Sequence, residues 1–213
     1  MHSIIIRNER ESDFRKVEEI HRRAFWNLNE PGCNEHYLAH VLRNHADFIP
    51  ELDCVAEVDG RVVANVMYTK SRLVDASGNA KDIFSFGPIA VEPEYQRRGI
   101  GKMLLEETFH RAEAMGCRAI VIFGDPGNYA SRGFKSCKRY NVCLSGDVFP
   151  MALLVKELAP GFFDGTRYYF SESPAFEIDA KDAEAFDRDF EYMEKAVLPS
   201  QEVFYIHSHS VLR

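Results

Sequence analysis

A basic, glycine-rich segment is the part of the chain whose residue types are best suited to chemistry. It comprises Gln96, Arg97, Arg98, Gly99, Ile100, Gly101 and Lys102, and apolar residues at helical spacing follow it. The first-turn N–H groups of a helix have no partner within the helix, and together with the helix dipole they attract anions. Glycine lets the backbone approach a ligand closely. The segment is therefore predicted to hold a diphosphate, with the two arginines and the lysine adding positive charge.

Two common nucleotide-binding loops are excluded by particular residues. A mononucleotide P-loop requires Ser or Thr after its lysine, but Met103 follows Lys102. A dinucleotide-binding loop requires a third glycine at the position that Leu104 occupies. The pattern that remains is Gln-x-x-Gly-x-Gly.

With this pattern, and with Val91-x-Pro93-x-Tyr95 before it, the chain resembles the GNAT superfamily of acyl-CoA-dependent N-acetyltransferases. The resemblance implies an α/β fold of the GNAT (acyl-CoA N-acyltransferase) type, in which helices flank a mixed, largely antiparallel sheet. It also implies that acetyl-CoA is the co-substrate and that the basic segment binds its diphosphate. Upstream, Gly87-Pro88 predicts a bulge, because proline cannot donate to a sheet ladder. In the family the cofactor arm pairs with main-chain groups beyond this bulge, here those of Ile89 and Val91.

A second segment resembles the same family. Gly124-Asp125-Pro126 precedes a Tyr-x-x-x-Gly-Phe pattern that begins at Tyr129, as in a bacterial subgroup of small predicted GNAT acetyltransferases. The resemblance places Tyr129 near the cofactor sulfur, and a tyrosine hydroxyl is protonated at neutral pH, so it could donate a proton to the leaving thiolate. The family's usual pattern has a cofactor-contacting Asn several residues earlier. Here that contact is assigned to Asn128, which is adjacent to the tyrosine.

A general base and a metal site are the two other kinds of site that the sequence could contain. A general base is required because most amines are protonated at neutral pH, and Glu35, Glu57, Asp82 and Glu92 stay open as candidates. His36 and His40 have the i,i+4 spacing of a zinc pair, but Tyr37 stands where a metalloprotease has its Glu, and no third ligand is identifiable. No metal site is predicted.

Composition sets limits on the class of protein. The 213 residues carry a net charge of −7, which argues against a nucleic-acid partner. No apolar run approaches the roughly 20 residues that span a membrane, and the N-terminus lacks the features of a signal peptide. The 5 cysteines form no Cys-x-x-Cys pair, which favours reduced thiols. We therefore expect a cytoplasmic protein with no membrane partner.

The elements that must position these residues follow from the pattern along the chain. Strands are expected over 3–7, 52–58, 61–70, 81–91, 119–124, 137–144 and 151–158, and helices over 14–24, 34–44 and 100–115. Asp59-Gly60 indicates a hairpin turn. These elements form a predicted acetyltransferase domain over 1–158.

A C-terminal extension over 159–213 is expected to pack on the same domain. Within it, a strand is expected over 167–171 and a helix over 180–195, and His207 and His209 alternate as on one face of a strand. The apolar side of the expected helix, with Phe186, Phe190 and Met193, could pack on the core. It could instead form a substrate lid or the surface of a homodimer.

The predicted function is transfer of the acetyl group from acetyl-CoA to a primary amine, by direct attack in a ternary complex. The amine could belong to a small molecule or a peptide. The alternative is a catalytically silent acyl-CoA-binding module used for sensing or interaction, because its cofactor segment would look the same. A site for another phosphorylated ligand is a third alternative, which the two missing nucleotide signatures disfavour.

Overall fold

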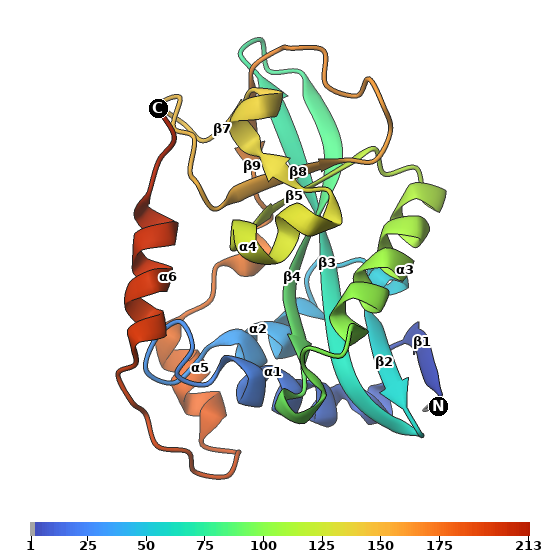
Figure 1. Cartoon of the computed structure of the whole chain (residues 1–213), viewed down its shortest axis with the longest axis vertical. Coiled ribbons are helices and arrows are strands. Elements are labelled where there is room, and N and C mark those ends of the chain that lie inside the picture. Colours follow the sequence, from blue (N-terminus) through green and yellow to red (C-terminus); the bar gives the residue numbers. More distant parts are fainter. Residues whose placement is uncertain (1–2) are drawn as a thin grey trace.

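Residues 3–213, the part of the chain that the computed structural model describes, are organised around one nine-stranded sheet (Figure 1). The main path of the sheet has the order β1-β2-β3-β4-β5-β8-β6, and β9 pairs with both β3 and β7. The pairs β4–β5 and β7–β9 are parallel and the others are antiparallel. The strands are β1 (Ile4–Asn8), β2 (Cys54–Val58), β3 (Arg61–Asp75), β4 (Ala80–Val91), β5 (Ala119–Phe123), β6 (Lys135–Ser136), β7 (Val142–Cys143), β8 (Leu153–Glu157) and β9 (Tyr168–Ser171). The predicted mixed, largely antiparallel sheet is confirmed.

Helices cover both faces of the sheet. They are α1 (Phe14–Phe25), α2 (Glu35–Leu42), α3 (Ile100–Ala114), α4 (Pro126–Tyr129), α5 (Ala180–Asp187) and α6 (Pro199–His209). On one face, Leu104 and Leu105 of α3 are buried against the sheet in the largest apolar cluster. On the other face, Val17 and Ile20 of α1 pack against Val55, which belongs to a separate cluster. Both α1 and α3 bury their apolar sides, as their residue spacing predicts.

The centre of the sheet is distorted at the predicted bulge. Gly87 and Pro88 lie opposite Met67 of β3, where the register between β3 and β4 shifts. On its other side, β4 is joined to β5 by the single register pair Phe84 and Ile120. Within residues 3–213, β4 therefore has no β5 partner beyond this pair, and the two strands diverge. The β5-facing edge of β4 is free to pair with a ligand.

The expected strand over 137–144 is wrong for most of its length. Residues Cys137–Tyr140 form a 3-10 turn, in which the Ser136 hydroxyl accepts a hydrogen bond from the Lys138 N–H at 3.2 Å. Asn141 then adopts a left-handed conformation with φ of 54°. A side-chain cap and a left-handed residue both oppose an extended ladder, so only the two-residue β7 remains as strand.

The expected helix over 180–195 is also shorter in the structure, because α5 ends at Asp187. After it, the chain bonds to side chains at the end of α1. The Trp26 Nε1–H donates to the Glu194 carbonyl at 2.9 Å, and the Asn27 Oδ1 accepts from the Ala196 N–H at 3.0 Å. These side chains satisfy backbone groups that a helix would otherwise pair.

His207 and His209 lie on α6, so their placement on a strand is wrong. The helix starts at Pro199, a residue favoured at the first helical position. In Figure 1, α6 runs along the side of the molecule, beyond α4, and it has no buried residue. It is held at both ends, where the Gln201 Nε2–H donates to the Asn27 carbonyl at 3.1 Å and Val211 bridges to Pro150.

Candidate active site

A groove of about 570 Å³ lies where the free edge of β4 meets the start of α3 and the α4 segment. We call it the basic groove. It brings together every site residue predicted from the sequence except Arg98. Its lining comprises Ile89, Val91, Tyr95, Gln96, Arg97, Gly99, Ile100, Gly101, Lys102, Leu105, Gly127, Asn128, Tyr129, Ser131 and Arg132.

The backbone before α3 is folded so that several N–H groups face outward from the helix start. Arg97 and Gly99 both adopt left-handed conformations, with φ of 61° and 84°. The first hydrogen bond of the helix runs from the Met103 N–H to the Gly99 carbonyl at 3.0 Å. The N–H groups of Ile100, Gly101 and Lys102 therefore have no partner within the helix, which is the arrangement that binds an anion.

Close packing fixes this loop against the end of β4. The Gln96 side chain donates to the Val91 carbonyl at 3.0 Å, so this predicted ligand contact also braces the loop. A Cβ on Gly101 would lie 3.4 Å from Val91 Cγ2. The absence of a side chain at Gly101 thus keeps the floor of the groove open beside β4. These features fit a diphosphate cradle.

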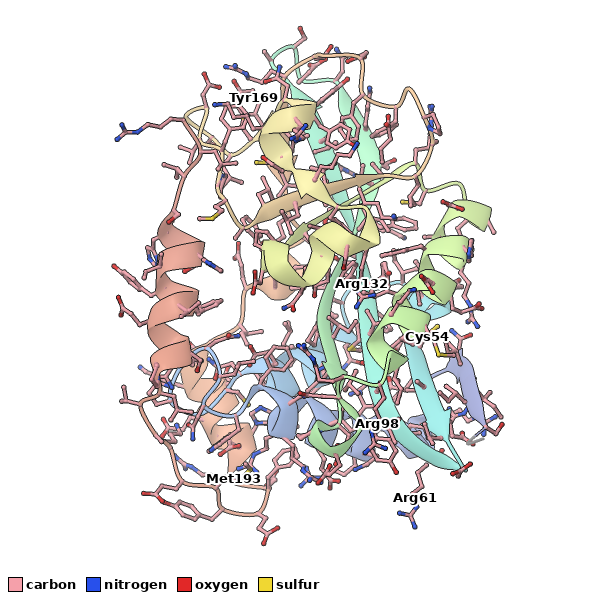
Figure 2. The ribbon with its side chains drawn as sticks, in the orientation of Figure 1. Cys54, Arg61, Arg98, Arg132, Tyr169 and Met193 are labelled. Atoms are coloured by element: carbon pink, nitrogen blue, oxygen red, sulfur yellow. The ribbon has the colours of Figure 1, made fainter. Side chains whose placement is uncertain are left out.

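Three cationic side chains line the groove. Lys102 and Arg97 come from the predicted segment, whereas Arg132 comes from the turn after α4 and was missed by the sequence analysis. The signal available in the sequence was that Arg132 lies directly before Gly133-Phe134, at the end of the pattern that begins at Tyr129. Arg98 instead stacks over the ring of Tyr95, with its guanidinium carbon 5.4 Å from the ring centre, outside the groove lining. Figure 2 shows Arg98 by the loop before α3 and Arg132 between α3 and α4.

Tyr129 stands at the end of α4, a short helix capped by the Asp125 side chain, which accepts from the Gly127 N–H at 2.8 Å. Its ring packs against Phe86 and Phe134, with ring centres 5.6 and 5.7 Å away. Burial raises the pKa of Tyr129 to about 12. The phenol is therefore protonated at neutral pH and can act only as a proton donor to a reacting group.

Three of the four candidate bases are held away from the basic groove. Glu57 on β2 pairs with Arg7 at 2.9 Å. Asp82 is 88 % exposed and lies 3.5 Å from Arg72. Glu92 is buried on the α1 side of the sheet, where it pairs with Arg23. None of these three carboxylates lines the basic groove.

The fourth candidate, Glu35, lies at the start of α2 and accepts hydrogen bonds from the Asn29 side chain and the Asn34 N–H, at 3.2 and 3.1 Å. Burial raises the pKa of this carboxyl group. Glu35 lines a different cavity, beneath α6, and not the basic groove.

His36 and His40, which have the spacing of a zinc pair, contact separate partners. His36 Nε2 lies 3.2 Å from Asp187 of α5, whereas His40 Nδ1 lies 2.9 Å from Glu18 of α1. Among the described residues, no group of three or more His, Cys, Asp or Glu side chains could hold a metal ion. Over the same residues, the structure has no helix both long and apolar enough to cross a membrane.

Comparison with models of known protein families shows whether the chain belongs to the family that its motifs resemble. The family model described as Acetyltransferase (GNAT) family matches residues 14–136, which is more than half of the chain. The chain belongs to this family. The predictions of a GNAT N-acetyltransferase, and of an acyltransferase as its enzyme class, are thereby confirmed.

Individual GNAT relatives agree with this assignment. The chain is 26% identical over 126 residues to the uncharacterized N-acetyltransferase YjhQ of Escherichia coli K12, a match that spans 59% of this chain and 66% of YjhQ. It is 27% identical over 163 residues to the uncharacterized N-acetyltransferase YhbS of the same strain, over 76% of this chain and 92% of YhbS.

Solved GNAT structures share the fold. Escherichia coli YhbS in complex with CoA superposes with a TM-score of 0.71 at 24% identity, covering 83% of this chain and 93% of that one. A GNAT acetyltransferase from Brucella melitensis in complex with acetyl-CoA gives 0.65 at 24% identity, covering 83% of this chain and all of its own. The predicted GNAT fold is confirmed.

Proposed function

We propose that this GNAT protein transfers the acetyl group of acetyl-CoA to a primary amine by direct attack in a ternary complex. The observation that carries the proposal is the continuity of the basic groove. One groove joins the helix start that can bind a diphosphate, the free edge of β4 and the phenol of Tyr129. The thioester of acetyl-CoA bound along this groove would reach the protonated Tyr129 hydroxyl where β4 and β5 diverge.

Each part of the groove has a role in this reaction. The N–H groups at the start of α3, with Arg97 and Lys102, would bind the diphosphate. Main-chain groups of Ile89 and Val91 would pair with the amide-bearing arm of CoA along the β4 edge. Asn128, beside Tyr129 in the lining, would contact the same arm.

The reaction balances with the groups present. The substrate ammonium loses one proton to water, the amine nitrogen bonds to the acetyl carbon and loses a second proton to water, and the carbon–sulfur bond breaks. The leaving sulfur takes a proton from the Tyr129 hydroxyl, which water then reprotonates. Support for CoA as the ligand comes from YhbS and the Brucella melitensis protein, which were crystallised with CoA and acetyl-CoA.

The second candidate function is a catalytically silent acyl-CoA-binding module. The observation that favours it is that the groove lining includes none of the carboxylates Glu57, Asp82 and Glu92. An amine could still lose its proton to water, so this observation does not remove the enzyme proposal.

One experiment separates the two functions. The protein is incubated with acetyl-CoA and a panel of primary amines, release of free thiol is followed, and CoA binding is measured in parallel by calorimetry. We expect CoA binding and amine-dependent thiol release. Binding without turnover of any amine would favour the silent module, and no CoA binding would overturn both functions.

A further inference from the structure

A second cavity lies directly beside the basic groove, beneath α6. We call it the inner cavity; it has a volume of about 510 Å³ and is enclosed by α6, the end of β5 and the start of α4. Most of its wall is apolar, with Phe123 and Leu28 on one side and Val203 and Phe204 of α6 on the other. Its polar end contains Asp125.

The inner cavity is contiguous with the proposed reaction site. Asn128 lines both the inner cavity and the basic groove. Gly124 lines the inner cavity, and the ring of Tyr129 rests on it so closely that a Cβ on Gly124 would lie 2.6 Å from Tyr129 Cε2. A substrate in the inner cavity would therefore lie next to the phenol that faces the thioester.

Carboxylates predominate among the charged groups around these spaces. Asp125 Oδ1 in the inner cavity lies 3.8 Å from His207 Nδ1 of α6. A neighbouring outer cavity of about 640 Å³ shares Phe204 with the inner cavity and is lined by Glu30, Glu35 and Glu202. In the described part of the chain, no Lys or Arg lines either cavity. An excess of carboxylates attracts a cationic ligand and repels an anionic one.

Within the described residues, the apolar side chains of α6 belong to none of the apolar core clusters. Val203 is 53% exposed and Phe204 is 47% exposed, although both face the cavity. Exposed apolar surface that lines a concave site is a common mark of a ligand site. Filling the cavity with an apolar group would remove this surface from water.

Resting on the proposed acetyl transfer, we propose that the inner cavity is the acceptor site and that its substrate is a primary amine on an apolar body, such as an arylalkylamine. The ammonium end lies at Asp125, next to Tyr129. The alkyl or aryl body lies beneath Val203 and Phe204. A strongly hydrophilic amine would leave the apolar side chains of the inner cavity in contact with water. Burying its polar groups against those side chains would be unfavourable.

The test compares amines that differ in their apolar body. Rates of thiol release are measured for 2-phenylethylamine, ethanolamine and spermidine. We expect kcat/KM for 2-phenylethylamine to exceed that for ethanolamine by roughly tenfold or more, as apolar pocket contacts allow. Phe204→Ala should remove most of this preference. Ile206→Ala, on α6 but outside both cavity linings, is the matched control and should retain it.

Binding to the CoA-saturated protein is measured as well, because it requires no turnover. We expect 2-phenylethylamine to bind, and Asp125→Asn to weaken it roughly tenfold while leaving 2-phenylethanol binding unchanged. Asparagine keeps the acceptor that caps α4, so the variant should fold.

The outcomes separate this inference from the proposed function. Binding of 2-phenylethylamine without turnover of any amine would support an amine site in the inner cavity and overturn acetyl transfer. Turnover of hydrophilic amines at equal or greater kcat/KM, unaffected by Phe204→Ala, would overturn the inference and leave acetyl transfer standing. Absence of any amine binding would overturn the inference.

Discussion

At the scale of single residues, the position of Tyr129 depends on a glycine outside its own motif. Gly124 directly follows β5, and its missing side chain provides the space that the Tyr129 ring occupies. Phe86 of β4 and Phe134 hold the other sides of the ring. The phenol is thereby placed at the divergence of β4 and β5, which is where the proposed reaction needs a proton donor.

Replacing Tyr129 by Phe removes the hydroxyl and keeps the ring packing. We expect kcat to fall by about 10²-fold, the lower end of a general-acid contribution, while the dissociation constant for acetyl-CoA stays near that of the wild type. Thiol release and calorimetry give the two quantities. Full turnover in this variant would reduce Tyr129 to a packing residue.

Gly124→Ala tests the same placement without changing the donor. The new Cβ must displace the Tyr129 ring, so we expect kcat to drop by roughly ten- to a hundredfold with CoA affinity preserved. Steady-state kinetics and CoA titration of the purified variant would show this. A variant with wild-type kcat would mean that the ring position is not critical.

At the scale of elements, the start of α3 and the free edge of β4 form one binding surface. The left-handed residues Arg97 and Gly99 turn the chain so that unpaired N–H groups and cationic side chains point to one groove. The bulge at Gly87-Pro88 and the divergence from β5 leave the adjoining strand edge open. Neither element alone would hold a long cofactor.

The contribution of the Arg97 and Lys102 charges to acetyl-CoA binding can be tested by comparison with Arg98, a cationic residue of the same loop. Arg97→Ala combined with Lys102→Ala should raise KM for acetyl-CoA by roughly three- to thirtyfold, because each charge contributes about 0.3–1 kcal/mol at an exposed helix start. The effect should shrink in 1 M salt. Arg98→Ala is the control, since Arg98 lies outside the groove lining and should leave KM unchanged. An equal rise in KM for the control would point to a general charge effect.

At the scale of the whole molecule, the C-terminal residues contact the rest through the sheet and through buried polar groups. Strand β9 pairs with β3, and Asp187 of α5 lies 2.6 Å from Arg22 and 3.2 Å from His36. Phe190 stacks beneath Arg15, whose guanidinium carbon is 3.5 Å from the ring centre. We infer that 1–158 and 159–213 fold as one domain, with α6 held over the inner cavity.

The packing of α1 on the sheet predicts an acid-sensitive stability. His21 is fully buried with its Nε2 2.9 Å from Asn65 Oδ1, and burial lowers the pKa of His21 to about 4. The unfolded chain, with a His pKa near 6.5, binds the proton more readily. The free energy of unfolding should therefore fall as the pH drops from about 6.5 to 4, by about 3 kcal/mol from this group.

Urea denaturation of the wild type and of His21→Gln at several pH values checks this prediction. Glutamine does not titrate, so the difference in unfolding free energy between the two proteins should shrink toward pH 4 and be constant above pH 7. Parallel pH dependences would contradict a neutral, buried His21.

The features predicted best from the sequence are those set by residues close together in the chain. The helix start beside Lys102, the bulge at Gly87-Pro88 and the hairpin turn at Asp59-Gly60 all follow from local backbone preferences. Such preferences act over a few residues, so the order of residues alone indicated the diphosphate segment and the family.

The tertiary structure alone decided which residues face the acceptor. Glu57, Asp82 and Glu92 are plausible bases by type, but only their long-range ion pairs show that they are held elsewhere. Phe204 and Asp125 are far apart in the chain, yet they line the same cavity. Helix α6 was missed because its apolar residues pack against no core and their pattern is weak. The cavity exists because chain segments at both ends of α6 hold the helix over the split sheet, and this arrangement depends on distant contacts.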